Sequence, residues 1–304
     1  MNRVINFHDV QDKVWFEKTI IYLKGKYNLI DADKLYEYYV EHKNLKNACH
    51  ITIDDGDRLF YDVMFPILKK HKIPATIFIS PKIIMEEKNF WFQEIEDFDF
   101  VLLTKIIAQQ LECDNELFQN YKVQTILKNC KIEKIWSIIN EYKKENEVCS
   151  VKKFNINLEE LLEIDRNELI TIGAHTQNHP ILANETDQAS YLEISESIQN
   201  LEQILKHKIT NFAYPNGISN IDFGTREMQF LKQNNIKLGF SSTISNLKKS
   251  DNTMAIPRIG ISDGDKLYLK FKLLLGKKWA FLKKIKSSNE EYNRNAIKLK
   301  IANK

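Results

Sequence analysis

The sequence predicts an α/β fold built on a parallel sheet or barrel, and two features of its hydrophobic pattern support that prediction. Several short runs rich in β-branched and aromatic residues each stand next to a polar or turn residue. Between most of these runs, apolar residues recur three and four positions apart, which is the spacing of helices packed on a core. Alternation of strand and helix favours parallel pairing, and in such folds functional residues gather at the carboxyl ends of the strands.

The predicted elements follow one another along most of the chain. The strands are residues 4–7, 51–53, 75–79, 169–172, 211–213, 238–240 and 255–259. The helices between them are residues 57–71, 188–207 and 225–234. The alternation is interrupted where three consecutive segments have the pattern of helices with charged faces, at 98–112, 117–129 and 132–147. We expect one domain over 1–265, with a helical insertion at about 94–160 over one edge of the sheet, and a tail over 266–304.

Histidines and carboxylates fall at the ends of the predicted strands. If the chain forms a helical turn there, His175 and His179 lie on one face, within reach of a single cation. One of Asp54 and Asp55 would complete a ligand set of two histidines and one aspartate, and the other would polarise the attacking water. Each pattern alone is typical of turns or surface histidines. Their joint occurrence with the Tyr-Pro-Asn-Gly turn at 214–217 predicts a metal site that performs hydrolysis.

The charge is unevenly distributed along the chain. The whole chain has a net charge of +3, whereas residues 266–304 contain twelve lysines and arginines against two glutamates, so an acidic body ends in a basic tail. Residues 266–286 interleave lysines with large apolar residues, which predicts an amphipathic helix. Its apolar side would either pack on the body or lie on an anionic membrane surface. Nucleic acid would attract the same charge, but we see no recognition motif and expect no nucleic-acid partner.

The cysteines and the N-terminus do not indicate export. The cysteines form no close pair, which is typical of free thiols in a reducing compartment; they are Cys49, Cys113, Cys130 and Cys149. The first residues contain no apolar stretch long enough for a signal peptide, and no window approaches the ~18 apolar residues of a membrane span. We expect a cytoplasmic protein whose tail can bring it to the periphery of a membrane.

Three motifs, in order, resemble those of the polysaccharide deacetylase (NodB-homology) family, the carbohydrate esterases of the fourth family, and especially its bacterial surface-polysaccharide subgroup. Thr-Ile-Asp-Asp-Gly at 52–56 resembles the motif T-F-D-D-G, and His-Thr-Gln-Asn-His-Pro at 175–180 resembles H-[ST]-x-x-H followed by proline. Phe-Ala-Tyr-Pro-Asn-Gly at 212–217 looks like a variant of the third motif, R-P-P-Y-G. Shorter likenesses occur at 6–8, 73–78 and 257–260. The resemblance covers roughly residues 4–93 and 158–262, and the order and spacing of the first two motifs make it specific.

The resemblance implies a distorted (β/α)7 barrel of the NodB-homology type and metal-dependent removal of an N- or O-acetyl group from a sugar. By their positions in the motifs, Asp55, His175 and His179 would hold one divalent ion, which we expect to be Zn²⁺. Asp54 would be the general base. The backbone N–H of Asn216 would help to form the oxyanion hole.

The chain departs from the family's pattern in two places. The third motif's arginine, which in the family steadies the catalytic aspartate, is replaced by Ala213, and we expect Arg258 from the last predicted strand to take its role. The family's late Leu-x-His motif, which carries the general acid, is missing because no histidine follows His207. The expected substitute is His8, which ends the first predicted strand. A missing acid matters more for an amide than for an ester, because a departing amine must be protonated.

We therefore predict a hydrolase that removes acetyl groups from an acetylated saccharide in cell-surface polysaccharide metabolism. The residues themselves support metal-assisted hydrolysis, whereas the sugar and the acetyl group come from the resemblance. Two alternatives stay open. The chain could be a non-catalytic carbohydrate-binding descendant that keeps the fold and the metal, or a basic-tailed scaffold for polysaccharide assembly at the membrane surface. Turnover of acetylated saccharides separates the enzyme from both.

Overall fold

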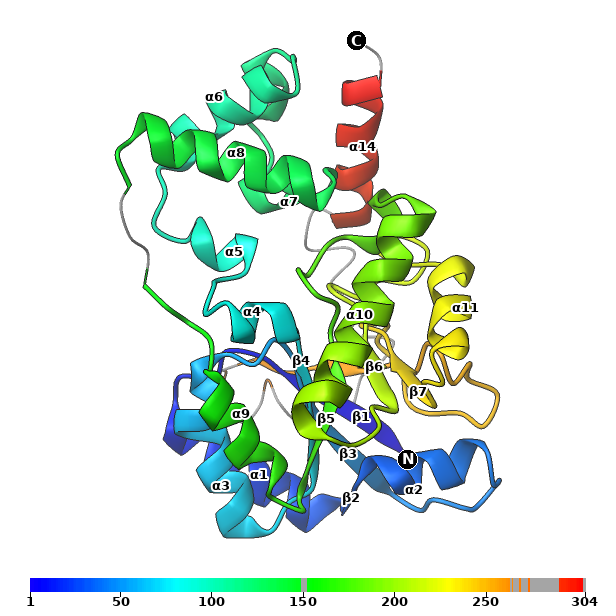
Figure 1. The fold of residues 1–304 in the computed structure, drawn as a ribbon. Helices are drawn as coiled ribbons and strands as arrows, with labels where there is room; N and C mark the ends of the chain where they lie inside the picture. The colour runs from blue at the N-terminus through cyan, green and yellow to red at the C-terminus, as the bar shows by residue number, and fades with distance from the viewer. Residues whose placement is uncertain (149–151, 263, 265–267, 269–272, 274–289, 303–304) are drawn as a thin grey trace.

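The fold is organised around one curved parallel sheet (Figure 1). The computed structural model describes residues 1–148, 152–262, 264, 268, 273 and 290–302. In these residues the strands follow one another across the sheet in the order β7-β6-β5-β4-β3-β1-β8, and β2 pairs with β3 beside this path. The strands are β1 (Arg3–Phe7), β2 (Asn28–Ile30), β3 (Ala48–Ile53), β4 (Ala75–Ile79), β5 (Ile170–Ala174), β6 (Asn211–Ala213), β7 (Leu238–Phe240) and β8 (Ile259–Gly260).

The two edges of the sheet are joined by the segment that precedes β8. Ile256 forms an isolated parallel bridge with Phe240 at the end of β7, and the Ser241 N–H donates to the Ile256 carbonyl at 2.9 Å. Three residues later β8 pairs with β1, in the register Ile5 with Ile259. The sheet is therefore closed into a distorted barrel of parallel strands, which confirms the predicted fold class.

The main hydrophobic core lies between the sheet and the helices that surround it. Ile5 and Phe7 of β1 belong to this core, as do Phe16 and Ile20 of α1. The N-cap of α1 is Asp12, whose carboxylate accepts from two backbone N–H groups of the first turn. The surrounding helices are α1 (Lys13–Lys26), α2 (Ala32–Tyr39), α3 (Phe65–His71), α4 (Pro81–Met85), α9 (Leu158–Asp165), α10 (Asp187–Leu205) and α11 (Thr225–Gln233). A π-helical turn, η1 (Phe60–Met64), precedes α3, and a 3-10 turn, η3 (Leu182–Asn184), precedes α10.

The strands β1, β3 and β4 also carry buried polar side chains that are bonded to one another. The Thr52 hydroxyl donates to the side-chain oxygen of Asn6 at 2.8 Å. The His50 ring lies between the Ile30 carbonyl, 2.8 Å from Nδ1, and the Thr76 hydroxyl, 3.0 Å from Nε2. Since buried polar groups are stable only when they are paired, this network lets the strands carry polar residues through the interior to their carboxyl ends.

The segment expected as an insertion folds into helices with a hydrophobic core of their own. They are α5 (Trp91–Glu94), α6 (Phe100–Gln110), η2 (Asn115–Phe118), α7 (Val123–Leu127) and α8 (Ile132–Glu145). The C-terminal helix α14 (Glu290–Ala302) packs against α7, and its Ile297 is fully buried in the core of the insertion (Figure 1). The chain thus returns at its C-terminus to cover the insertion.

The amphipathic helix expected at 266–286 falls almost entirely outside the described residues, so that prediction is not tested. Within the part of the chain that the structure describes, no helix is both long and apolar enough to cross a membrane.

Candidate metal centre and active site

A pocket of about 300 Å³ opens at the carboxyl ends of the barrel strands. Strand ends and the loops that follow them form one side of it, and α5 and α7 of the insertion supply residues to the other. All the site residues singled out in the sequence line this pocket: His8, Asp54, Asp55, His175, His179, Asn216 and Arg258. Further lining residues are Asn6, Trp91, Phe92, Gln124, Lys128 and Ser242.

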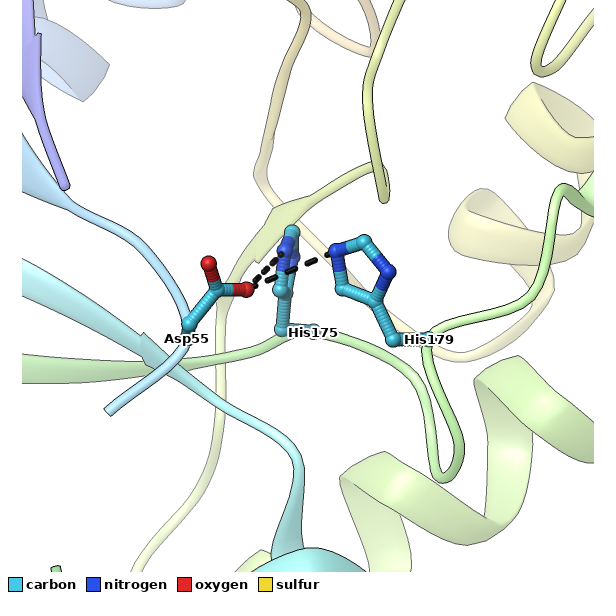
Figure 2. Close-up of side chains that lie close together, drawn as sticks. All are labelled: Asp55, His175 and His179. Carbon is cyan, nitrogen blue, oxygen red and sulfur yellow. Dashed lines mark ion pairs between the residues drawn. The ribbon is translucent and has the colours of Figure 1, made fainter. Parts of the chain in front are cut away.

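Asp55, His175 and His179 point toward one another (Figure 2). His175 directly follows β5, and its Nδ1 lies 2.7 Å from the Ala213 carbonyl, so Nδ1–H donates there and leaves the Nε2 lone pair free. Both histidine Nε2 atoms lie 3.4 Å from Oδ1 of Asp55. Asp55 and Gly56 both have φ 76°, and this tight left-handed turn after β3 aims the carboxylate at the imidazoles.

The expected helical turn at 175–179 is wrong. The segment is a loop in which Thr176 (φ 63°) and His179 (φ 55°) are left-handed. A left-handed residue at each end reverses the chain direction, so two histidines four apart come together without a helix. The Thr176 hydroxyl oxygen accepts from the His179 N–H at 3.1 Å, which stabilises this unusual backbone.

A carboxylate from α10 holds the same loop from outside the pocket. Glu193 is buried, and its Oε2 accepts from the N–H groups of Gln177 and Asn178, each at 2.9 Å. Its Oε1 accepts from the Asn178 side-chain amide at 2.5 Å. These bonds satisfy the backbone donors between the two histidines and so fix the spacing of the histidines.

The donor set fits a metal ion. One ligand atom from each of Asp55, His175 and His179 lies within 4.8 Å of the others. Asp55 Oδ1, the oxygen that faces both histidine Nε2 atoms, is buried and has no hydrogen-bond partner in the described residues. Burial lowers the pKa of His179 to about 4, so its ring is neutral near pH 7 and offers a lone pair. The Nε2 atoms of two histidines and a carboxylate oxygen that converge on one point are a ligand set for a divalent transition metal.

Asp54 belongs to a different arrangement. Its oxygens accept from Arg258 at 2.6 and 2.9 Å, and Asn6 donates to Oδ2 at 3.0 Å. Burial would raise the pKa of Asp54, but the Arg258 guanidinium outweighs it and holds that pKa well below its usual range. The guanidinium is itself fixed by the Ser241 carbonyl, 3.0 Å from Nε. Arg258, which comes from the segment before β8, therefore holds the Asp54 carboxylate in place, while Ala213 stands at the motif position. The catalytic role of Asp54 stays a prediction.

His8 and Asn216 are the two remaining site residues predicted from the sequence. The half-exposed His8 ring has its Nε2 3.5 Å from Asp54 Oδ2. Asn216 has φ 56° in the turn after β6, and none of the described residues accepts a hydrogen bond from its backbone N–H. Both residues line the pocket. Their chemical roles stay predictions.

Several residues of the pocket were not predicted from the sequence as site residues. Asn6 had a local signal, because it is the single polar residue of the predicted strand at 4–7. The rings of Phe90 and Phe92 pack on His179, at 5.3 and 5.1 Å between centroids. Trp91 and Phe92 also line the pocket. Lys128 had no local signal, since the docking of the insertion places it there.

Comparison with known proteins identifies a family. The family model described as polysaccharide deacetylase matches residues 41–109 and 119–238. The poly-beta-1,6-N-acetyl-D-glucosamine N-deacetylase of Staphylococcus aureus is 25% identical over 249 residues, which are 82% of this chain. The match covers 66% of that relative, just under two thirds of its length.

Solved structures share the fold. IcaB from Ammonifex degensii superimposes with a TM-score of 0.59 at 15% identity, covering 90% of this chain and 97% of that one. The Streptococcus pyogenes deacetylase PplD, in complex with acetate, gives a TM-score of 0.58 at 16% identity, covering 86% and 92%.

Proposed function

The chain belongs to the polysaccharide deacetylase family, and from this premise we propose that it is a metal-dependent hydrolase that removes acetyl groups from a surface polysaccharide. The observation that carries the proposal is one pocket in which Asp55, His175 and His179 form a ligand set beside a separately held carboxylate, Asp54. Metal-assisted hydrolysis requires a metal ligand set next to an ionised base, and this pocket contains both.

We propose an N-acetylated, β-1,6-linked glucosamine polymer as the substrate, because the Staphylococcus aureus relatives are named for that activity. We propose Zn²⁺ as the ion, since two imidazoles and one carboxylate with an open position are typical of catalytic zinc. When bound, such an ion polarises the acetyl carbonyl and lowers the pKa of water to about 7.

The chain's own residues would divide the remaining work. Asp54, held ionised by Arg258, accepts the proton of the attacking water, whose oxygen adds to the acetyl carbon. The Asn216 N–H donates to the developing oxyanion. As the bond between carbon and nitrogen breaks, His8 gives a proton to the departing amine, so that acetate and a free amino sugar are released.

Acetate release from defined β-1,6-linked N-acetylglucosamine oligomers tests the proposal. Activity should disappear with a chelator and return with stoichiometric Zn²⁺, and a His179→Ala variant should bind less metal than the parent. Metal-loaded, folded protein that binds the oligomers but releases acetate from neither N- nor O-acetylated saccharides would favour the non-catalytic alternative. That alternative is worth testing because the chain lacks the arginine of the third motif and the late histidine of the family.

A further inference from the structure

One buried ion pair outside the pocket joins three parts of the chain. Arg294 of α14 is almost completely buried, and its guanidinium donates to the carboxylate of Asp222, which is also buried. The Nη2 of Arg294 also donates to the carbonyl of Lys128 at 3.1 Å. A single side chain of the C-terminal helix therefore connects the loop after β6 with the insertion.

Asp222 holds the loop that carries Asn216. Its Oδ2 accepts from the Ile218 N–H at 2.8 Å, and its own N–H donates to the Ile218 carbonyl at 2.9 Å. Gly217, between Asn216 and Ile218, has φ 72°, and a Cβ there would lie 3.0 Å from the Ser242 nitrogen. The turn is also held at Gly217, whose carbonyl accepts from the Ser242 N–H at 2.7 Å. Asp222 supplies the two bonds at Ile218, two residues after Asn216, and so holds the other end of the turn.

Lys128 lines the same pocket as Asn216. Its carbonyl accepts from Arg294 and also from the Asn184 side-chain amide at 2.9 Å. Its ammonium lies 2.7 Å from Oε1 of Glu290, the first residue of α14. Both the backbone and the side chain of this pocket residue are thus bound to the C-terminal helix.

We propose that Arg294 is a positioning residue for catalysis, which fixes the Asn216 loop and the Lys128 wall relative to each other. The C-terminal helix is then part of the support of the active site. The kinetic consequence rests on the proposed deacetylase function. Because the oxyanion exists only near the transition state, displacing the Asn216 N–H lowers kcat more than it raises KM.

The test removes both charges together, because a lone buried charge would destabilise the fold. An Arg294→Gln/Asp222→Asn double variant should bind metal as the parent does but lose about ten- to hundredfold in kcat, the scale expected for a small misplacement. An Arg294→Lys variant keeps the charge with fewer donors and should retain more of the rate. Lys300→Gln is the matched control, because Lys300 also lies on α14 and bonds to the insertion through the Leu117 carbonyl at 3.3 Å.

Hydrogen exchange supplies a readout that needs no activity. The amides of residues 216–223 and 123–130 should exchange faster in the double variant and in Arg294→Lys than in the parent or in Lys300→Gln. A parent that releases no acetate would refute the proposed function, while the exchange result would still decide the role of Arg294. Folded variants with parental exchange in both segments and parental kcat would overturn the inference. If the double variant does not fold, Arg294→Lys decides by the same measurements.

Discussion

Replacing Glu193 by glutamine should weaken metal binding without removing any ligand. Three hydrogen bonds from Gln177 and Asn178 end on this carboxylate. Glutamine keeps one oxygen for the two backbone donors, but its amino group would face the Asn178 side-chain amide, so one bond becomes a contact between donors. The loop that spaces His175 and His179 would then lose part of its support.

The size of the effect follows from the number of bonds changed. A hydrogen bond to a charged group contributes roughly 1.5–3 kcal/mol, so losing one such bond in Glu193→Gln should cost about 2 kcal/mol of unfolding free energy. Removal of a group that orients metal ligands typically costs about 10- to 100-fold in metal affinity, and we expect a loss in that range.

Competition with a chromophoric chelator measures the affinity, and thermal unfolding of the metal-free protein measures the stability. Glu196→Gln is the matched control, because Glu196 lies on the same helix and is exposed. A folded Glu193→Gln variant with the metal affinity of the control would show that the loop holds its shape without this carboxylate, and our reading of Glu193 would be wrong.

Four further predictions concern the site, the barrel interior and the tail. Asp54→Asn should keep its metal but lose about 10²–10⁴ in kcat, as expected for a general base; loss of metal in a folded variant would instead make Asp54 a ligand. His8→Ala should slow N-deacetylation more than the hydrolysis of an acetyl ester, and equal losses on matched substrates would argue against His8 as the acid. Burial lowers the pKa of His50 to about 4 in the folded protein, whereas the same side chain in the unfolded chain has a pKa of ~6.5. Between these two pH values the unfolded chain binds a proton that the folded protein does not, so the free energy of unfolding should fall with falling pH by up to ~1.4 kcal/mol per pH unit. Denaturant unfolding at several pH values measures this slope, which His50→Gln should reduce if our assignment is correct. We also propose that the basic tail binds anionic membranes; liposome co-sedimentation that is salt-sensitive in the full chain and lost on truncation after Asp265 would support this, and equal sedimentation of both folded proteins would contradict it.

Much of the barrel could be predicted because its strands are short apolar runs flanked by turn residues. The helix α1 and the strand β2 were not among the elements predicted from the sequence, and each shows a limit of this pattern. In α1, Phe16, Ile20 and Leu23 are buried at helical spacing, but Val14 and Ile21 are exposed, so apolar residues occur on both sides of the helix and blur the period. The strand β2 has three residues, too few for an alternating pattern to be recognised.

The site residues that belong to sequence motifs could be predicted, whereas the contacts that depend on tertiary packing could not. The motifs contain Asp55, His175 and His179, so these ligands could be predicted from local sequence. The helical turn predicted between the two histidines was wrong, because a spacing of four residues is compatible both with a helix and with a loop that has two left-handed residues. The contact of Arg294 with Asp222 joins positions 72 residues apart through the docking of a helix, and no spacing rule reports it.

The left-handed residues of the active site affect how the heat resistance of this enzyme could be increased without loss of activity. Asp55, Thr176, His179 and Asn216 all have positive φ without being glycine, and such conformations cost on the order of 1–3 kcal/mol each. Screening a mutant library for heat resistance alone would therefore reward replacements that relax these positions, and those replacements would damage the chemistry. A library that leaves these four positions fixed and varies the outer helices should yield heat-resistant clones that remain active.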